Sequence, residues 1–505
     1  MPNPLFDTLL ASHRVNESNF LKDLDGNTRS YAIFFENVLR TANALGNCGL
    51  KRGDRLAIQV EKSFQSLEIY MACVASGIIF LPLNTAYTIN EVSYFLEDAT
   101  PKVFICDPAQ KTEFIAKTTN SKLLIYSLAA NGTGSFSNLV VEQPANFKPV
   151  DLDAHDVAAL LYTSGTTGRS KGAMLTHRNL LSNAEILVEQ WRITADDTLL
   201  HALPIFHTHG LFVAVNTTLL AGSSIIFLPN FKPDTVINNL PKTTIMMGVP
   251  TFYTRLLDDP RFNKNLVKNV RLFISGSAPL LPETHKIFET RTGHYILERY
   301  GMTETNMITS NPFEGERRAG TVGFPLPDIK VRIMKDGQEA EVQKGEVGMI
   351  EVNGPNVFKG YWKMPEKTAE ELRDNGFLIT GDLGYIDEDN YLHIVGRKKD
   401  LIISGGYNVY PKEVELVLDD LPGILESAVI GVPHPDFGEA VIAVLVASPN
   451  SNIDISNVHA KLELNLAKYK QPKKLFLIKS LPRNTMGKVQ KNLLRDTHKN
   501  LFMTV

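Results

Sequence analysis

The sequence predicts an α/β protein in which largely parallel sheets are flanked by helices, followed by a smaller α+β domain. Apolar, β-type runs such as 56–60 and 103–107 alternate with segments of helical periodicity. This alternation is typical of parallel sheets, because each parallel pair needs a crossover connection. The chain has 505 residues, more than one ordinary domain, and its segments shorten after about residue 380.

The elements can be assigned in chain order. Residues 30–50 predict an amphipathic helix, since Ala32, Phe35 and Val38 recur at helical spacing. The Gly-, Ser- and Pro-containing residues 128–152 predict a loop, and Pro250 is a candidate helix start. Further helices are expected at 63–76 and 453–466, and strands at 56–60, 78–81, 103–107, 157–161, 224–229, 244–249, 270–275, 428–430 and 441–446.

Composition excludes several classes of function. The formal charge is 52 − 55 = −3, which argues against nucleic acid as a bulk electrostatic partner. Cys48, Cys73 and Cys106 are scattered, so neither a zinc site nor a disulfide framework is expected. Residues 1–7 lack the features of a secretory signal, and no uncharged apolar segment reaches about 18 residues. We therefore expect a cytoplasmic protein without a membrane span, either monomer or dimer.

The polar segment 162–172 gives the first indication of chemistry. Its glycines allow successive N–H groups to point at one spot, while its hydroxyls and two cations add donors and positive charge. That combination suits a polyphosphate better than a plain hairpin turn. The candidate phosphate-binding residues are Thr163, Ser164, Gly165, Thr166, Thr167, Gly168 and Lys171.

This segment resembles the phosphate loop of the adenylate-forming superfamily, which includes acyl-CoA synthetases, luciferases and adenylation domains. Later segments match in the family's order, at 298–305, 380–384, 396–408 and 482–488. The resemblance implies a large domain of residues 1–396 and a mobile domain of residues 397–505. It also implies ATP, Mg²⁺ and coenzyme A as the small molecules bound.

The same resemblance assigns roles residue by residue. Tyr300 would lie against adenine, Thr303 would bond a phosphate, and Glu304 would hold Mg²⁺. Lys488 would be the catalytic lysine, and Lys399 the hinge. The remaining implied contacts are Ser277, Ala278, Pro279, Glu298, Asp382 and Arg397 with ATP, and Gly405, Gly406 and Tyr407 with CoA.

The acid pocket is expected to be polar. By resemblance, His207 is the gate beside the carboxylate, with Thr208 and His209 following it, while Gly301 and Met302 close the pocket. If a helix starts at Pro250, Thr251 and Arg255 lie one turn apart on one face. Arg255 could then grip a second carboxylate bidentately, with Arg271 or His209 as alternatives.

These pocket segments resemble the malonyl-CoA synthetase subfamily. The expected reaction joins malonate to CoA through a malonyl-adenylate and releases AMP and pyrophosphate, with methylmalonate as a weaker substrate. A synthetase for short-chain or aromatic monocarboxylates is the main alternative, and solvent exposure of Arg255 would favour it. A non-catalytic binding paralogue and a domain that loads a carrier protein are further alternatives. No motif excludes a luciferase-type oxygenase, although nothing in the sequence requires oxygen.

Overall fold

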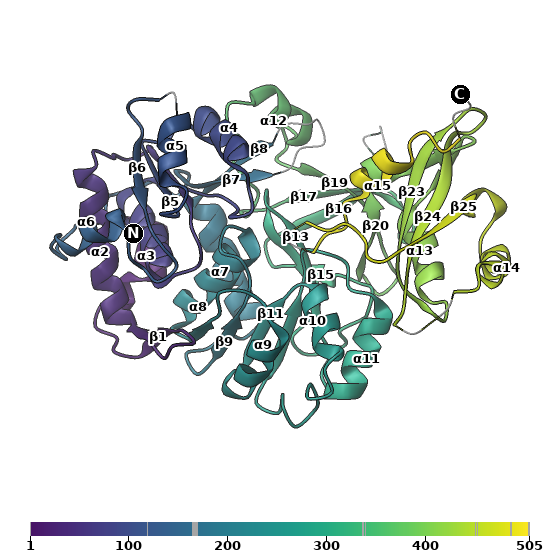
Figure 1. Ribbon diagram of the computed structural model, residues 1–505, viewed down its shortest axis with the longest axis horizontal. Helices are drawn as coiled ribbons and strands as arrows, with labels where there is room; N and C mark the ends of the chain where they lie inside the picture. The colour runs from purple at the N-terminus through teal and green to yellow at the C-terminus, as the bar shows by residue number, and fades with distance from the viewer. Residues whose placement is uncertain are drawn as a thin grey trace.

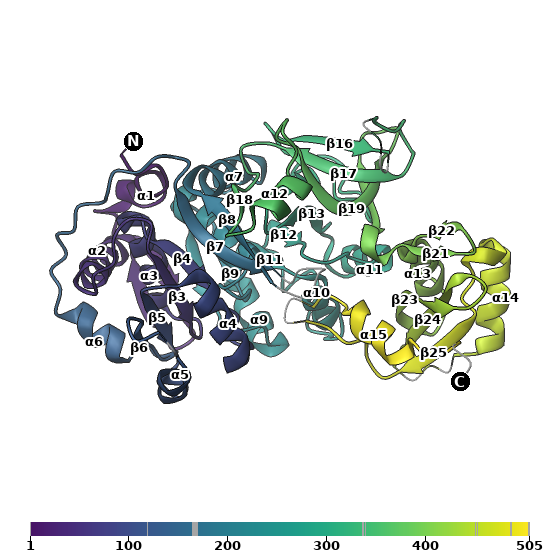
Figure 2. The same cartoon turned by 90° about the horizontal axis from the view of Figure 1, so that it is seen from above.

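The computed structural model describes residues 2–118, 120–163, 170–335, 338, 340–449, 451, 453–484 and 487–502. Within these ranges the chain forms four sheets with helices packed on them, which confirms the predicted α/β class (Figure 1). The C-terminal sheet lies apart from the N-terminal helices, and Figure 2 shows the same separation from above. No described helix combines the length and apolar character needed to cross a membrane.

The sheet that carries the phosphate segment is parallel through its middle. Its β7 strand pairs with β4 in parallel and with β8 antiparallel, so residues 164–169 connect two neighbouring strands. In spatial order the strands are β18 (Gly360–Tyr361), β8 (Lys171–Thr176), β7 (Val157–Thr163), β4 (Ile79–Pro82), β3 (Arg55–Gln59), β5 (Val103–Cys106) and β6 (Leu124–Ser127).

A second sheet carries the acid and adenine segments. Its central strands run parallel, so the loops after β9, β11, β12 and β13 meet at one edge. In spatial order the strands are β15 (Phe324–Pro325), β14 (Asn306–Ser310), β13 (Leu297–Met302), β12 (Leu272–Ser275), β11 (Ile245–Gly248), β9 (Thr198–His201), β10 (Ser224–Phe227), β1 (Asn19–Lys22) and β2 (Thr28–Ser30).

Helices cover these two sheets. The predicted helix at 63–76 is α3, which begins at a Ser63 capping box and ends at Gly77 with φ +67°. The helices up to residue 292 are α1 (Pro4–Leu9), α2 (Tyr31–Asn47), α3 (Phe64–Ser76), α4 (Ile89–Ala99), α5 (Lys111–Lys117), α6 (Ser135–Val141), α7 (His177–Gln190), α8 (Asn216–Ala221), α9 (Pro233–Asn239), α10 (Pro250–Leu257) and α11 (Pro282–Thr292).

The prediction of a loop over residues 128–152 was wrong in part, because α6 lies within it. Phe136 is buried in the main apolar cluster, and its ring meets that of Tyr126 at a centroid distance of 5.8 Å. Packing of α6 against α2 and the main apolar cluster stabilises a short helix that local composition does not favour.

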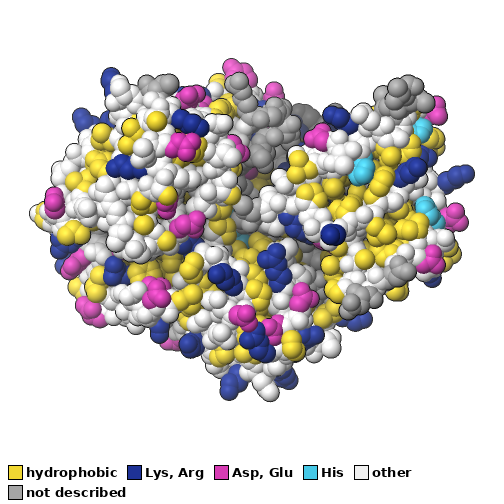
Figure 3. Space-filling view, in the orientation of Figure 1, with side chains coloured by type: hydrophobic (Ala, Val, Ile, Leu, Met, Phe, Trp, Pro, Cys, Tyr) yellow, Lys and Arg dark blue, Asp and Glu magenta, His cyan; other side chains and the backbone are white. Residues whose placement is uncertain are grey.

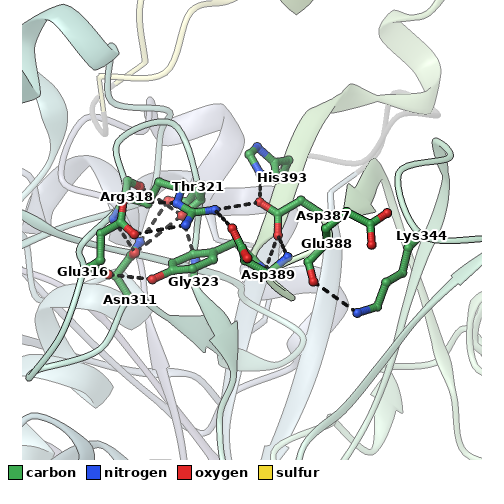
Figure 4. Close-up of polar contacts among 11 residues, drawn as sticks. Asn311, Glu316, Arg318, Thr321, Gly323, Lys344, Asp387, Glu388, Asp389 and His393 are labelled. Carbon is green, nitrogen blue, oxygen red and sulfur yellow. Dashed lines mark hydrogen bonds and ion pairs between the residues drawn. The ribbon is translucent and has the colours of Figure 1, made fainter.

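A third sheet links the two main sheets to the C-terminal part. It contains β16 (Lys330–Met334), β17 (Gly348–Asn353), β19 (Leu378–Ile386) and β20 (Leu392–Arg397), and α12 (Pro365–Glu371) lies before β19. Figure 4 shows how its turn is tied to the loop after β14. Arg318 lies 3.2 Å from Asp387, which also contacts His393 at 2.9 Å. These contacts tie the turn after β19 to the loop after β14.

The C-terminal sheet is covered on both faces. Alternate residues of β23 and β24 enter two different apolar clusters, one with α13 and α14 and the other with Leu481 and α15. The strands are β22 (Tyr407–Val409), β21 (Ile402–Ser404), β24 (Gly438–Ala447), β23 (Ile424–His434) and β25 (Lys474–Ile478), with helices α13 (Pro411–Asp419), α14 (Ile455–Asn465) and α15 (Lys491–His498). This part of the chain has a core of its own.

Candidate active site

The predicted adenosine residues meet in space. Asp382 on β19 is opposite Arg397 on β20, and Arg397 Nε lies 2.8 Å from Asp382 Oδ1. The Tyr300 hydroxyl donates to Asp382 Oδ2 at 2.5 Å. Burial and the adjacent Asp382 charge raise the pKa of the Tyr300 hydroxyl, which stays protonated as a donor. A buried carboxylate held between a phenol and a guanidinium is well placed to accept a vicinal diol.

Glu298, also predicted to contact ATP, is buried on β13. Its Oε1 accepts a bond from the Gly320 backbone N–H at 3.4 Å. Burial raises the pKa of Glu298 to about 8, so the carboxyl is mostly protonated at pH 7. The predicted contacts Ser277, Ala278 and Pro279 follow β12, and Ser277 has the strained φ of +71°.

At the phosphate end, Ser164, Gly165, Thr166, Thr167 and Gly168 lie outside the described residues. Thr163 and Lys171 pair in the β7–β8 register at the two sides of that segment. Lys171 is buried, and its Nζ lies 2.9 Å from Glu371 and 4.2 Å from the centre of the Tyr361 ring. The lysine is therefore held in place by residues of the β18–α12 segment.

Glu304 joins the same network. The Tyr361 hydroxyl lies 2.9 Å from Glu304 Oε1 and 2.6 Å from Glu371 Oε2. Burial raises the pKa of Glu304, which lies within electrostatic reach of Lys171 and Arg397. Sequence reasoning missed Tyr361 and Glu371, because only tertiary structure places them beside Lys171.

Of the predicted residues 301–303, the first two end β13 and the third follows it. All three are half-buried. Gly301 has a structural reason to be glycine: a Cβ there would lie 1.9 Å from the Asn306 carbonyl oxygen. Met302 packs against the main apolar cluster, and Thr303 opens the turn to β14. The structure thus places all three beside Glu304.

The predicted gate residue precedes an irregular helix. His207 and Thr208 lie just before a π-helix at His209–Val215, a rare form often found at functional sites. The His209 backbone N–H donates to His207 Nδ1 at 3.2 Å, which leaves the His207 proton on Nε2. Burial, with the charges of Arg299 and Lys488, lowers the pKa of His207 to about 4, so it is neutral at pH 7.

A half-buried lysine, Lys62, supports this segment. Lys62 Nζ lies 2.9 Å from His201 Nδ1, and it donates to the carbonyls of His201 and Leu203 at 3.0 Å each. His201 Nε2 in turn lies 2.7 Å from the Gly210 carbonyl oxygen. This chain of contacts fixes the strand that leads to the gate, and nothing in the local sequence around Lys62 indicated it.

Buried polar atoms without described partners lie next to the predicted gate. Thr208 Oγ1 and His209 Nε2 are buried and have no hydrogen-bond partner within the described chain. His209 Nδ1 lies 3.4 Å from Ser277 Oγ. Burial and the charge of Arg299 hold the pKa of His209 well below its ordinary value. A buried polar group without a partner costs free energy, so such a cluster favours a polar ligand.

Arg299 was given no role by the sequence interpretation. It lies on β13 with 3% of its surface exposed, and its Nε and Nη2 atoms have no described partner. Its guanidinium packs on Gly276, where an added Cβ would lie 2.4 Å from Cζ. Burial lowers the pKa of Arg299 to about 9, so it remains charged at pH 7. The sequence signal that could have identified Arg299 is an arginine inside a buried strand, because arginine is rarely fully buried without a partner.

The structure places the candidates for pairing the second carboxylate in different surroundings. Arg255 is exposed, because the face of α10 that carries it points away from the protein interior. Arg271 is held by Asp197, with contacts of 2.8 and 2.5 Å. Thr251, the other predicted α10 residue, is half-buried and lies at the loop before Lys488: a Cβ on Gly487 would approach its Oγ1 to 2.9 Å.

Lys488 faces the site from the C-terminal lobe. Lys488 is exposed, but desolvation by the groups around its ammonium and the nearby Arg397 charge lower its pKa. Asp382 and His207 are also within electrostatic reach of it. In Figure 3 a furrow separates the two lobes, and Lys and Arg side chains lie along it. The structure therefore brings Lys488 to the adenosine and acid groups.

The predicted CoA residues are not at the site in this arrangement. Gly405, Gly406 and Tyr407 are exposed at the β21–β22 turn, where the glycines have φ of +59° and +81°. Tyr407 stacks on Tyr469 at a centroid distance of 4.7 Å. Lys399 is exposed in the short 3₁₀ segment Lys398–Asp400 between β20 and β21.

The chain belongs to the AMP-binding enzyme family: the family model matches residues 11–362, and the model of the AMP-binding enzyme C-terminal domain matches residues 413–488. A malonate–CoA ligase from Arabidopsis thaliana is 34% identical over 485 residues, covering 90% of this chain and 79% of that protein. A feruloyl-CoA synthase from Amycolatopsis is 36% identical over 474 residues, covering 93% and 94%.

A solved structure is also similar over the full length. The ATP-bound MatB from Rhodopseudomonas palustris is 52% identical with a TM-score of 0.97, covering 99% of this chain and 100% of that one. The apo form of the same protein gives 0.86. These relations confirm the predicted superfamily and the predicted enzyme class, an AMP-forming acyl-CoA ligase that uses ATP and CoA.

Proposed function

We propose that the acid substrate is malonate, so that the enzyme makes malonyl-CoA, AMP and pyrophosphate, with methylmalonate as a weaker substrate. The observation that carries this proposal is the acid end of the site, where buried polar atoms of Thr208 and His209 have no partner among the described residues. A simple fatty acid would leave them unsatisfied, whereas a second carboxylate supplies acceptors. The Arabidopsis malonate–CoA ligase adds support.

In the first step, a malonate carboxylate oxygen attacks the α-phosphorus of ATP, and pyrophosphate leaves with the electron pair of the broken P–O bond. The Lys488 ammonium offsets the charge that develops on the phosphoryl oxygens. Tyr300 supports the adenine, while Asp382 and Arg397 hold the ribose. Thr303 binds phosphate, and the 163–171 segment takes the departing pyrophosphate. His207, neutral at pH 7, borders the reacting carboxylate.

The residues present fit a magnesium ion. No group of three or more His, Cys, Asp or Glu among the described residues is arranged to hold a metal, so a bound ion would depend on phosphate oxygens. Glu304 offers one buried carboxylate beside Lys171, which suits Mg²⁺, since this ion is often held by one carboxylate and substrate phosphates. The ion would neutralise phosphate charge.

In the second step, the CoA thiolate attacks the malonyl carbonyl carbon and AMP leaves. We assign this step to a second orientation of residues 397–505, reached by rotation about Lys399. The rotation would move Lys488 out of the active site and bring the Gly405–Tyr407 turn into it. Three observations support a two-position domain: the separate C-terminal core, the exposed hinge, and the different TM-scores against ATP-bound and apo MatB. Glycines at this turn leave room for the pantetheine arm.

A second candidate substrate class is a short-chain or aromatic monocarboxylate. Exposure of Arg255 favours it, and so does the similarity to feruloyl-CoA synthase. Pyrophosphate release measured with malonate, methylmalonate, acetate, butyrate and ferulate separates the two classes. We expect the highest kcat/KM with malonate; a higher value with ferulate or butyrate would refute the malonate proposal. No turnover with any acid would favour a binding paralogue.

A further inference from the structure

We propose that Glu426, on β23, is a positioning residue for Lys488 and thereby acts on the adenylation step alone. It acts through Arg483, which holds the backbone just before the lysine. This inference rests on the proposed role of Lys488, but it does not depend on which acid is the substrate. None of the motifs found in the sequence includes Glu426.

Arg483 connects two places in the C-terminal lobe. Its Nη2 atom forms an ion pair with Glu426 Oε2, and its Nη1 atom donates to the Gly487 carbonyl oxygen at 2.5 Å. The side chains of Glu426 and Arg483 are only 21% and 29% exposed, so the ion pair is less screened by water than an ordinary surface pair. A guanidinium can make both contacts at once, because its donors are fixed in one plane. The Gly487 carbonyl belongs to the peptide bond that leads into Lys488.

Backbone contacts close the chain around Lys488. The Asn484 N–H donates to the Lys488 carbonyl oxygen at 3.0 Å, and the Lys488 N–H donates to Asn484 Oδ1 at 2.9 Å. Arg483 and Val489 form an antiparallel bridge. These local bonds set the shape of the turn, but they do not fix its direction relative to the sheet. The ion pair of Arg483 with Glu426 ties the turn to β23.

The pleat of β23 presents Glu426 toward this turn. Ala428, two residues further on, lies in the apolar cluster that contains Leu481. Since alternate residues of a strand point to the same face, Glu426 lies on that face too. Ser427 points to the other face, where its hydroxyl donates to Asp419 on α13 at 2.7 Å. The register of the strand therefore brings the Glu426 carboxylate to Arg483.

The neighbouring acid is bound elsewhere. Glu415 Oε1 lies 2.6 Å from Lys491 Nζ and accepts from the Val429 N–H at 2.9 Å. Glu415 is therefore not available to replace Glu426 as the partner of Arg483.

The peptide that Arg483 holds also meets the N-terminal lobe. A Cβ on Gly487 would lie 2.9 Å from Thr251 Oγ1, so the Gly487 backbone lies close to α10. Rotation of the peptide between Gly487 and Lys488 would disturb this contact and redirect the lysine side chain. Misplacement of a catalytic group by about 1 Å can cost about a hundredfold in rate. Glu426 is thus placed to determine how precisely Lys488 enters the site.

The effect should be confined to one half-reaction. Lys488 acts in adenylation under the proposed function, and it leaves the site before CoA attacks. Glu426 and Arg483 both belong to the C-terminal lobe, so their ion pair is compatible with either orientation of that lobe. Loss of the pair should therefore slow adenylation and spare thioester formation. A residue that only stabilises the fold would affect both steps alike.

The test compares Arg483→Met, Glu426→Ala and Glu426→Gln with the wild-type protein and with Lys488→Ala. Ser427→Ala is the matched control, because it removes a hydrogen bond from the same strand on the opposite face. Adenylation is measured without CoA as malonate-dependent exchange of labelled pyrophosphate into ATP. Thioester formation is measured from supplied malonyl-adenylate and CoA, and thermal unfolding reports the folding of each variant. If another acid gives the highest kcat/KM, that acid and its adenylate replace malonate.

We expect Arg483→Met to slow the exchange by about thirtyfold or more, because it loses both contacts. Glu426→Ala should slow it by about tenfold, and Glu426→Gln by about threefold, since the amide keeps an acceptor oxygen but not the charge. Thioester formation should stay within about twofold of the wild type in all three variants. Ser427→Ala should lower the melting temperature and leave both half-reactions within about twofold of the wild type.

Equal loss in both half-reactions would overturn the inference, since the pair would then be purely structural. Normal exchange in Arg483→Met and Glu426→Ala, with exchange lost in Lys488→Ala, would also overturn it and leave the proposed role of Lys488 intact. If Lys488→Ala itself keeps normal exchange, the proposed role of the lysine and the inference fail together. If Arg483→Met or Glu426→Ala does not fold, Glu426→Gln decides: normal exchange in that variant refutes the positioning role.

Discussion

The replacement Asp382→Asn tests the assignment of the nucleotide end most directly. The carboxylate accepts from Tyr300 at 2.5 Å and from Arg397 at 2.8 Å, and it is buried. Asparagine has nearly the same shape, but it offers one acceptor oxygen and turns an NH₂ group toward another donor. One charge-assisted contact is therefore lost, and the positive charge of Arg397 is no longer balanced.

The cost follows from these contacts. A hydrogen bond to a charged group contributes about 1.5–3 kcal/mol, and the loss of the balancing charge adds to it. Because the same oxygens would accept the ribose hydroxyls, we expect ATP binding to weaken by about 2–4 kcal/mol. That corresponds to a roughly 30-fold to 900-fold fall in kcat/KM for ATP.

The assay is pyrophosphate release at varied ATP and saturating malonate, with thermal unfolding measured alongside. Asp387→Asn is the matched control: Asp387 follows the same strand but bonds to Arg318 and His393 instead. It should lower stability without raising the KM for ATP. If both variants lose stability equally and neither changes the KM for ATP, Asp382 is structural and the nucleotide assignment is wrong.

Three further predictions concern the catalytic lysine, the hinge and a buried acid. Lys488→Ala should abolish adenylate formation yet still convert supplied malonyl-adenylate and CoA to the thioester; equal loss in both half-reactions would contradict its role. Lys399→Pro, which fixes φ, should slow thioester formation more than adenylation, and a normal second step would place the pivot elsewhere. The difference in melting temperature between Glu298→Gln and the wild type should shift in favour of the variant as the pH increases from 5 to 8. The unfolded carboxyl loses its proton near 4.5 but the folded one near 8, so rising pH favours the unfolded wild type; a constant difference would refute this.

Local patterns determined most of the fold and the nucleotide half of the site. The periodicity of residues 30–50 and the cap at Ser63 specify helices without help from distant residues. Motifs whose residues are neighbours in sequence, such as Glu298 to Glu304, could also be predicted, because one strand and the turn after it contain all of them. The joint position of Tyr300, Asp382 and Arg397 was expected from resemblance, and the structure brings them together.

Tertiary structure decided what the pattern left open, and the arginines near the predicted acid pocket show why. Spacing correctly placed Thr251 and Arg255 on one face of α10, but spacing does not reveal whether that face is buried. Burial depends on what packs against an element, as with Arg299 against Gly276 or α6 against α2. The same holds for Lys62 beneath the gate and Tyr361 beside Lys171, whose partners are far away in sequence. The free energy of a buried charge is set by those distant partners, so it becomes visible only once the chain has folded.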